Sequence, residues 1–407
     1  MKTTDVVIVG GGIVGCVLAR GMSEQAGLEV TLVDASKPDS TDNTEEFNPL
    51  SDTRVIALAR RTVNELNAMG VGLTELAKQN HGKIEHIEVS EKGGIGLTHL
   101  LCRDYGLSTF GQVVSLSALT KLVMEQSTNY QHIAPATVTH VERTPDYTKV
   151  NLSDGQCIHT KLLVLADGGR STLAEQVGLT RHTHPYHQQA IIFNVHTSEP
   201  HNNKAYERFT SEGPLAFLPF DSEIDGVVAN NNGFSVVWTV SAQRAEVLQS
   251  LNKAEFIAQL QQAFGYRQGR IINMSDMASY PLSLSYTNTL FSHRTVVVGN
   301  AAQALHPIAG QGFNLGLRDI ITLIDSVKNQ PDPGDFSVLS HYSQKRAKDR
   351  KSTITLTDTL VRTFSNEHCP LVVARNMALT AFNLVPGIKR AFVRQTTGYA
   401  TSTTLHP

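Results

Sequence analysis

The sequence predicts an α/β protein: a Rossmann-like domain with an inserted antiparallel-sheet domain and a helical C-terminal region. Three observations predict this fold class. Residues 5–34 read as strand, glycine loop, helix and second strand. Residues 185–285 hold segments in which apolar and polar residues alternate, as in half-buried antiparallel strands. A buried strand at 294–299 then ends in glycine and returns the chain to the first type of domain.

Length and composition exclude several classes of protein. The chain has 407 residues, 41% of them hydrophobic, and a formal net charge of −2, so it can bury a large core and lacks the basic character of a nucleic-acid binder. Four cysteines lie far apart and form no CxxC, which favours a reducing compartment over a disulfide framework. Without a signal-peptide pattern or an apolar run of about 18 residues, we expect a cytoplasmic protein.

The first glycine loop has the spacing of a dinucleotide-binding turn. Gly10 permits the tight turn, Gly12 lets the backbone approach a pyrophosphate, and Gly15 lets the following helix pack closely on the strand. The N–H groups at the start of that helix face the phosphates. Asp34, 24 residues after Gly10, ends the second strand and can accept hydrogen bonds from a ribose.

The next segments are a polar loop and an expected helix. Residues 37–51 are rich in Ser, Asp, Asn, Thr and Pro, which is typical of a loop. A helix is expected over 52–69, closed by Gly70. Arg54 at its start could bind a phosphate with two hydrogen bonds, or be an ordinary exposed arginine.

The middle of the chain alternates between the two predicted domains. A half-buried strand is expected at 83–90, a helix at 115–127, strands at 138–141 and 150–158, and a buried strand at 161–166 that leads into Asp167 and Gly168. The predicted organisation is three dinucleotide-binding segments (1–75, 111–184 and 286–345), a sheet insertion (76–110), an inserted substrate domain (185–285) and a helical C-terminal region (346–407).

After the strand at 294–299, a loop rich in Gly and Pro leads into a helix that begins near Gly312. Such a loop can present backbone N–H groups and a helix N-terminus to an electron-rich ring or a phosphate.

The chain resembles the FAD-dependent aromatic hydroxylases of the p-hydroxybenzoate hydroxylase type over nearly its whole length. Three motifs carry the resemblance, in sequence order: the first glycine loop with Asp34, the Asp167-Gly168 pair and the block 299–319. Within that family, residues 299–316 and the segment 52–58 are similar to the branch that hydroxylates polyprenyl phenols in ubiquinone biosynthesis, and the similarity extends to 370–376.

The resemblance implies roles for the motif residues. Gly10, Gly12 and Gly15 would cradle the FAD pyrophosphate, Asp34 would hold the adenosine ribose, and Arg54 would contact the pyrophosphate. Asp167 and Gly168 would border the FAD and the path of the nicotinamide cofactor, and Asn300 would bind the ribityl chain. Pro307, Gly312 and Asn314 would line the isoalloxazine.

Three positions depart from the family pattern. Asn300 and Gln303 stand where related ring hydroxylases have Asp and His; the Asn300 amide keeps an oxygen acceptor but removes a charge. Ala174 stands where the family often has an arginine, seven residues after the Asp of the Asp-Gly pair. That part of nicotinamide recognition is therefore not transferred.

The implied reaction uses NADPH or NADH to reduce FAD and O2 to form a flavin hydroperoxide that transfers oxygen to a polyprenyl methoxyphenol. A dry, apolar pocket is needed because water discharges the hydroperoxide. His306 and Pro307, in the loop expected to face the flavin, are the catalytic candidates. His306 could relay a proton near neutral pH or simply order the loop.

Several alternatives remain at this stage. The substrate could be another quinone-ring position or a soluble aromatic acid, which needs a cation in the pocket, and a non-catalytic FAD-binding subunit is a third possibility. The histidines of 181–187 lack an accompanying Cys or carboxylate pattern, so we expect a connector between domains and no metal. The C-terminal helices could contact the inner membrane surface peripherally, bind other ubiquinone-biosynthesis proteins, or cap the catalytic core.

Overall fold

The computed structural model describes residues 2–36, 54–73, 76, 82–94, 96–126, 129–364 and 386–399. The expected polar loop at 37–51 and the stretch 370–376 lie outside the described residues.

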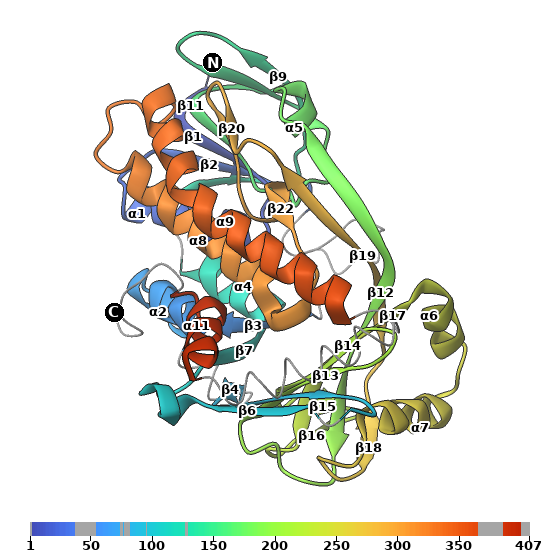
Figure 1. Cartoon of the computed structure of the whole chain (residues 1–407). Helices are drawn as coiled ribbons and strands as arrows, with labels where there is room; N and C mark the ends of the chain where they lie inside the picture. The colour runs from blue at the N-terminus through green and yellow to red at the C-terminus, as the bar shows by residue number, and fades with distance from the viewer. Residues whose placement is uncertain are drawn as a thin grey trace.

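One of the two large sheets of the molecule is mainly parallel (Figure 1). Its parallel strands, in spatial order, are β21 (Thr295–Val297), β11 (Cys157–Leu165), β1 (Lys2–Val9), β2 (Val30–Val33) and β8 (Gln131–Ile133). Antiparallel strands β20 (Phe291–Ser292), β10 (Thr148–Leu152) and β9 (Val138–Arg143) complete it. The chain enters this sheet in three separate stretches, as the buried apolar runs predict.

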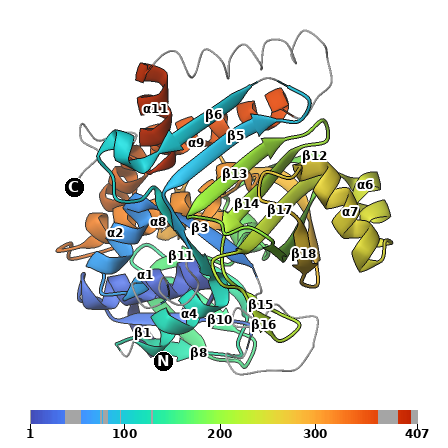
Figure 2. The same ribbon diagram turned by 90° about the horizontal axis from the view of Figure 1, so that it is seen from below.

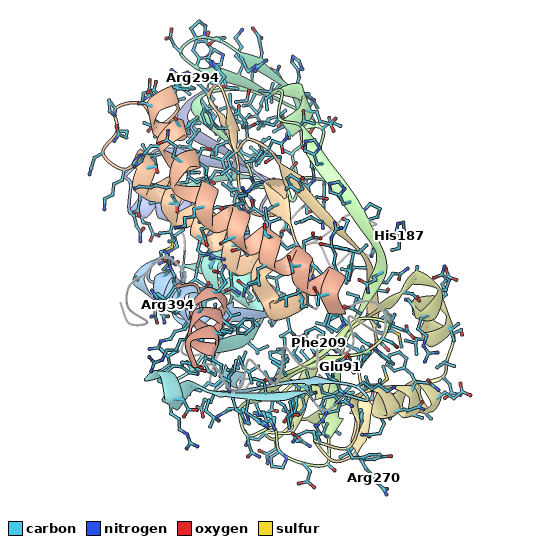
Figure 3. All side chains as sticks on the ribbon, in the orientation of Figure 1. Glu91, His187, Phe209, Arg270, Arg294 and Arg394 are labelled. Carbon is cyan, nitrogen blue, oxygen red and sulfur yellow. The ribbon has the colours of Figure 1, made fainter. Side chains whose placement is uncertain are left out.

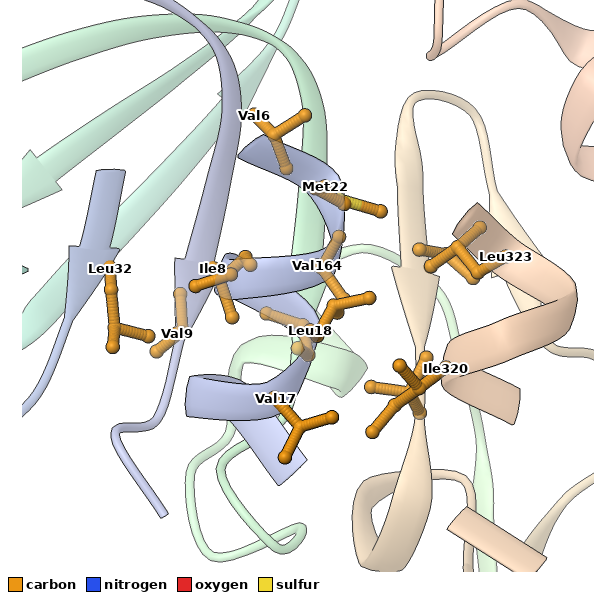
Figure 4. Packing of buried hydrophobic residues seen from close by; sticks show 14 of the residues in the cluster. Val6, Ile8, Val9, Val17, Leu18, Met22, Leu32, Val164, Ile320 and Leu323 are labelled. Atoms are coloured by element: carbon orange, nitrogen blue, oxygen red, sulfur yellow. The ribbon is translucent and has the colours of Figure 1, made fainter. Parts of the chain in front are cut away.

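Helices cover this sheet and bury its core. Helix α1 (Ile13–Glu24) follows the glycine loop, and α8 (Gln311–Val327) packs beside it. Figure 4 shows Leu18 and Met22 of α1 with Ile320 and Leu323 of α8 in the same cluster as the strand residue Ile8. Cys16 is fully buried in α1, as expected for a packing residue.

The other large sheet has nine strands, and its neighbouring strands lie side by side in Figure 2. Its strands are β22 (Gln303–Ala304), β19 (Ala278–Thr287), β12 (Arg181–Thr197), β17 (Gly233–Ser241), β14 (Pro214–Pro219), β13 (Lys204–Phe209), β5 (His86–Glu91), β6 (Leu97–Leu101) and β18 (Ile271–Met274). Helices α6 (Ala242–Gln249) and α7 (Lys253–Phe264) pack on its outer end, where Trp238 is buried.

Two sequence-based expectations are wrong. The helix expected over 52–69 is instead strand β3 (Val55–Ala59) followed by helix α2 (Arg60–Ala68). All five residues of β3 pair with β7 (Gly111–Ser115), which also pairs with β4 (Lys83–Ile84), and this distant partner outweighs the local helix-start signal. The strand expected over 150–158 is divided by a turn between β10 and β11.

The remaining elements are α4 (Leu116–Glu125), α5 (Leu173–Gln176), the hairpin β15 (Glu223–Ile224) and β16 (Val227–Val228), α9 (Phe336–Phe364) and α11 (Pro386–Thr396). The histidine-rich stretch 181–187 begins the 17-residue strand β12, in which His182 contacts the Asn288 amide at 3.0 Å. Within the described residues, no helix is long and apolar enough to cross a bilayer.

Candidate active site

A cavity of about 1110 Å³ lies between the carboxyl ends of the parallel strands and one face of the nine-stranded sheet. This is the edge at which open α/β sheets bind ligands. Ten of the twelve predicted site residues line it: Gly10, Gly12, Asp34, Arg54, Asp167, Gly168, Asn300, Pro307, Gly312 and Asn314. Gly15 and His306 lie behind the cavity wall.

The first glycine loop has the shape that a pyrophosphate needs. Gly10 has φ +107°, and a β-carbon there would lie 2.7 Å from the Ala166 carbonyl oxygen. A β-carbon at Gly15 would overlap the Gly10 carbonyl oxygen, so the helix could not pack as closely. At Gly12 a β-carbon would meet nothing within 4 Å. Gly12 caps α1 without any side chain, so the helix start opens on the cavity as an anion site.

Asp34 closes the same loop from the end of β2. One carboxylate oxygen accepts a hydrogen bond from the Gly11 N–H, and the other accepts one from the Ser36 N–H at 2.6 Å. The side chain is largely buried but still lines the cavity. Its contact with an adenosine ribose remains a prediction.

Arg54 lies just before β3, at no helix start. Its guanidinium carbon is 5.8 Å from the centroid of the Tyr280 ring on β19, within the range of a cation–π contact. Arg54 therefore bridges the two halves of the cavity wall. The contact with the pyrophosphate remains a prediction.

The Asp167-Gly168 turn is fixed by local hydrogen bonds. The Asp167 carboxylate accepts hydrogen bonds from the Gly169 N–H at 2.9 Å and from the hydroxyl of Ser171. Arg181, which sequence reasoning missed, donates to the carbonyl oxygens of Asn300, at 2.8 Å, and Ala301, at 3.1 Å. Its guanidinium also occupies the space next to Gly169, so it joins the two loops that flank Asn300.

Asn314 holds the start of α8 against β3. Its Oδ1 accepts the Ala59 N–H at 2.8 Å, while its Nδ2 donates to the carbonyl oxygens of Ala57, at 2.9 Å, and Gly310, at 2.6 Å. The amide therefore shapes the cavity wall by binding backbone groups. Gly312, in the first turn of α8, has open space where a β-carbon would be, so a second helix start faces the cavity.

A buried ionic cluster supports the loop at 299–303. The Asp319 carboxylate accepts hydrogen bonds from the Gly299 N–H at 3.2 Å, from Gln303 Nε2 at 2.7 Å and from Arg346 Nε at 2.7 Å. Gln303 in turn accepts a hydrogen bond from Arg350 at 2.6 Å. The Gln303 amide thus has a structural role: its NH2 group donates to Asp319 and its oxygen accepts from Arg350.

His306 is placed as a loop-ordering residue. Its ring is fully buried, and Nδ1 accepts the N–H of Ile308 at 3.2 Å. Nε2 has no hydrogen-bond partner among the described residues. Burial lowers the pKa of His306 to about 4, so the ring is neutral at pH 7. Of the two catalytic candidates, only Pro307 reaches the cavity.

The nine-stranded sheet contributes an almost wholly apolar wall. Its lining residues are mostly Ala, Val, Ile, Leu, Phe and Pro. Thr98, Tyr206, Thr239 and Tyr280 add polar groups, and Glu207 on β13 is the one charged residue among the described lining residues of this sheet. Sequence reasoning missed Glu207. Burial raises the pKa of Glu207 to about 7. The signal was present, since alternate residues Ala205, Glu207 and Phe209 place one carboxylate between two apolar side chains on one face.

Helix α11 closes part of the cavity. Phe392 and Thr396 line it, and Val393 is buried against the cluster of residues around β4 and β7. The Gln311 amide also donates to the Thr396 carbonyl oxygen at 3.4 Å. The described part of the C-terminal region therefore caps the core, one of the roles expected for it.

Comparisons with known proteins agree with this arrangement. The profile of the FAD binding domain family matches residues 3–357. The chain is 32% identical to the ubiquinone hydroxylase UbiL of Rhodospirillum rubrum, covering 98% of this chain and 90% of the relative. It is 28% identical to the 3-demethoxyubiquinol 3-hydroxylase of Escherichia coli, covering 98% and 99%.

Solved structures share the fold. The p-nitrophenol 4-monooxygenase PnpA of Pseudomonas putida superposes with a TM-score of 0.74 at 17% identity, covering 98% of this chain and 99% of that one. A single-residue variant of HpxO from Klebsiella pneumoniae, complexed with FAD, gives a TM-score of 0.73 at 16% identity and covers 98% of each chain.

Proposed function

This chain belongs to the FAD binding domain family, and from that premise we propose that it is a flavin-dependent monooxygenase that hydroxylates a polyprenyl methoxyphenol in ubiquinone biosynthesis. The substrate of the proposed reaction is a 2-polyprenyl-6-methoxyphenol. The relatives named as ubiquinone hydroxylases support this placement over nearly the full length of the chain.

One observation carries the proposal: a single cavity joins the glycine cradle to the apolar face of the nine-stranded sheet. A cofactor held on the cradle would therefore face a largely apolar wall that suits a lipid-tailed ring. Burying a long prenyl tail on such a wall is favourable by about 0.8 kcal/mol per CH₂.

The residues of the cradle are suited to FAD. The start of α1 would bind the pyrophosphate, Asp34 the adenosine ribose, and Asn300 the ribityl chain, while the Pro307 loop and the start of α8 would border the ring system. When bound, FAD supplies the activation of O2 and the delivery of one oxygen atom to the substrate ring. The chain's own residues orient the two rings and keep water out.

NADPH or NADH is the proposed electron donor and O2 the co-substrate. With Ala174 where the resemblance implies an arginine, two arginines lie near the Asp167 turn: Arg170 lines the cavity, and Arg181 lies beside Gly169 behind it. Its position supports a part for Arg181 in shaping the approach of the nicotinamide.

A soluble aromatic acid suits this pocket less well. A benzoate-type substrate needs a cation near its carboxylate. The cations among the described lining residues, Arg54 and Arg170, lie on the cofactor side of the cavity, and the nine-stranded sheet contributes Glu207 and no lysine or arginine. A carboxylate on that wall disfavours an anionic substrate.

The proposal extends to how the lipid reaches the enzyme. Ile388 is 49% exposed in the first turn of α11, next to Lys389 and Arg390. An exposed apolar residue beside basic ones supports peripheral contact with an anionic membrane surface or with other ubiquinone-biosynthesis proteins. Flotation of the purified protein with anionic and neutral vesicles tests the membrane contact; equal recovery with both would contradict it.

The central experiment uses the purified, FAD-loaded protein with NADPH or NADH, O2 and a short-chain 2-prenyl-6-methoxyphenol. We expect substrate-stimulated oxygen consumption and a product heavier by one oxygen atom, detected by mass spectrometry. The Gly12→Asp variant serves as the cofactor-binding control. If the phenol is unchanged while benzoate-type acids are hydroxylated, the quinone assignment is wrong. If neither is oxidised, and prenylated phenols open at other ring positions are not oxidised either, the chain is a non-catalytic FAD-binding subunit.

A further inference from the structure

The proposed reaction needs an acceptor for the proton of the phenol, and Glu207 is the carboxyl group on the cavity wall that the nine-stranded sheet provides. It lies on β13 between Ala205 and Phe209, which point to the same face of the sheet. Phe209 packs against Ile308, the residue after Pro307 in the loop that borders the expected flavin ring. Phe209 lies where the nine-stranded sheet approaches α9 (Figure 3). One alternation along the strand therefore brings Glu207 opposite the flavin side of the cavity.

The neighbours of Glu207 on the sheet are apolar. Val89 of β5 and Ala216 of β14 are its partners in register, and both line the cavity. Its Oε1 is buried and has no hydrogen-bond partner among the described residues. An unpartnered carboxyl group on an apolar wall is costly to keep, which indicates a ligand that supplies the missing hydrogen bond.

Other titratable groups near this wall do not replace Glu207. Those that line the cavity, or pack against its wall from the loops and α9, are Asp34, Arg54, Glu91, Asp167, Arg170, Tyr186, Tyr206, Tyr280, His306 and Asp358. His306 lies behind the wall, and Tyr186 donates its hydroxyl to Asp358 at 3.1 Å. Burial alone raises the pKa of Glu207 to about 7, the range in which a general base is most effective near neutral pH.

We propose that Glu207 is the catalytic residue that accepts the proton of the substrate's phenol hydroxyl. This inference rests on the proposed function. In the step, the phenol O–H bond breaks and its proton moves to a Glu207 carboxylate oxygen. The O–H electron pair becomes the second bond of a ring carbonyl. The para carbon bonds to one O2-derived oxygen atom, which bound FAD would supply, as the O–O bond breaks and its electron pair stays on the other oxygen atom.

The para carbon then loses its hydrogen as a proton. Glu207 returns its own proton to the carbonyl oxygen, and the ring is aromatic again with a second hydroxyl. The other atom of O2 takes up the proton released by the para carbon and leaves as water. The reduced nicotinamide and one solvent proton supply the two electrons and the remaining hydrogens. A carboxyl group that exchanges protons near pH 7 suits both halves of this cycle.

The test compares Glu207→Gln with wild type in the FAD-loaded protein. Glutamine keeps the shape of the side chain but accepts no proton. We expect hydroxylation to fall by about 10²–10⁴-fold while the phenol still stimulates oxidation of the nicotinamide, so that the oxygen consumed appears as hydrogen peroxide. In wild type, hydroxylation should rise with pH through about 7, and this rise should be absent in the variant. Glu223→Gln, at an exposed position on β15, is the matched control.

A second substrate separates a proton acceptor from a merely structural residue. A fluorinated methoxyphenol that is already ionised at the assay pH needs no base, so the ratio of wild-type to Glu207→Gln rates should shrink to about tenfold or less. Glu207→Asp keeps a carboxylate and should retain part of the activity. FAD content and circular dichroism establish that the variants fold.

Each outcome is decisive. Two results would overturn the role of Glu207 as the base without affecting the proposed function. One is a Glu207→Gln variant that hydroxylates within about threefold of wild type, and the other is a loss of activity that is equally large for the ionised phenol. If wild type yields no product from the prenylated phenol, the proposed function fails, and the role of Glu207 fails with it.

Discussion

Replacing Glu207 by glutamine should stabilise the folded protein, and the gain should grow with pH. In the unfolded chain this glutamate ionises around the ordinary value of 4.5, whereas in the folded protein burial raises the pKa of Glu207 to about 7. Below pH 4.5 both states are protonated. Between these values only the unfolded chain releases the proton, so wild type loses stability as pH rises.

The size of the effect follows from the difference between the pKa values of Glu207 in the unfolded and folded states. Two and a half pH units at 1.36 kcal/mol each give about 3 kcal/mol, reached near pH 7 and constant above it. Glutamine does not ionise, so the variant lacks this loss. Any cost of burying its amide adds an offset that does not depend on pH.

Urea unfolding followed by circular dichroism measures this difference, with FAD saturating in both proteins. The free energy of unfolding of Glu207→Gln minus that of wild type should rise by about 3 kcal/mol from pH 4.5 to 7 and then level off. Glu223→Gln, at its exposed site, should give a flat line. A flat line for Glu207→Gln as well would refute the claim that the folded protein buries this carboxyl group.

Three further predictions concern the cradle and its supports. Gly12→Asp should fold but bind FAD about 100-fold more weakly, since its carboxylate would face the phosphates. Gly15→Ala should lose both helix packing and FAD binding, because its β-carbon overlaps the Gly10 carbonyl oxygen. FAD titration and circular dichroism distinguish the two variants, and equal behaviour would contradict the geometry. His306→Asn should keep hydroxylation within about threefold because the amide can still accept the Ile308 N–H, whereas His306→Ala should cost about 1–3 kcal/mol of stability; a large kinetic loss in His306→Asn with FAD retained would make the ring catalytic. Asn314→Ala leaves three backbone groups without their partner and should lower the free energy of unfolding by about 3 kcal/mol in urea titrations, and a change below about 1 kcal/mol would show that water replaces the amide.

Much of this architecture is readable from sequence because its signals are local. The glycine loop, α1, the buried strands and the loop before α8 each combine a special residue with an apolar run of the right period. The parts of the cavity wall that depend on those motifs were therefore predicted with their residues. The domain boundaries remain a prediction.

The errors come from contacts between distant parts of the chain. Strand β3 looks like a helix start because Asp52 and Thr53 precede it, and only its pairing with β7 decides otherwise. The alternation of Ala205, Glu207 and Phe209 puts Glu207 on an apolar face of its strand, but only the pairing of β13 with β5 and β14 shows that this face lines the cavity. Which side of the loop His306 occupies is likewise set by tertiary packing.

Main-chain atoms form one side of the cavity and side chains form the other, and this difference affects how such an enzyme can evolve. The cradle depends on main-chain atoms at glycine positions, where a single β-carbon at Gly10 or Gly15 would collide with backbone. The opposite wall consists of alternate side chains on neighbouring strands, each of which can be exchanged without moving the chain. Mutations that alter substrate preference can therefore accumulate on the strands while the cofactor site stays unchanged. A selection for new aromatic substrates should begin with libraries at Ala216, Val237 and Ile192.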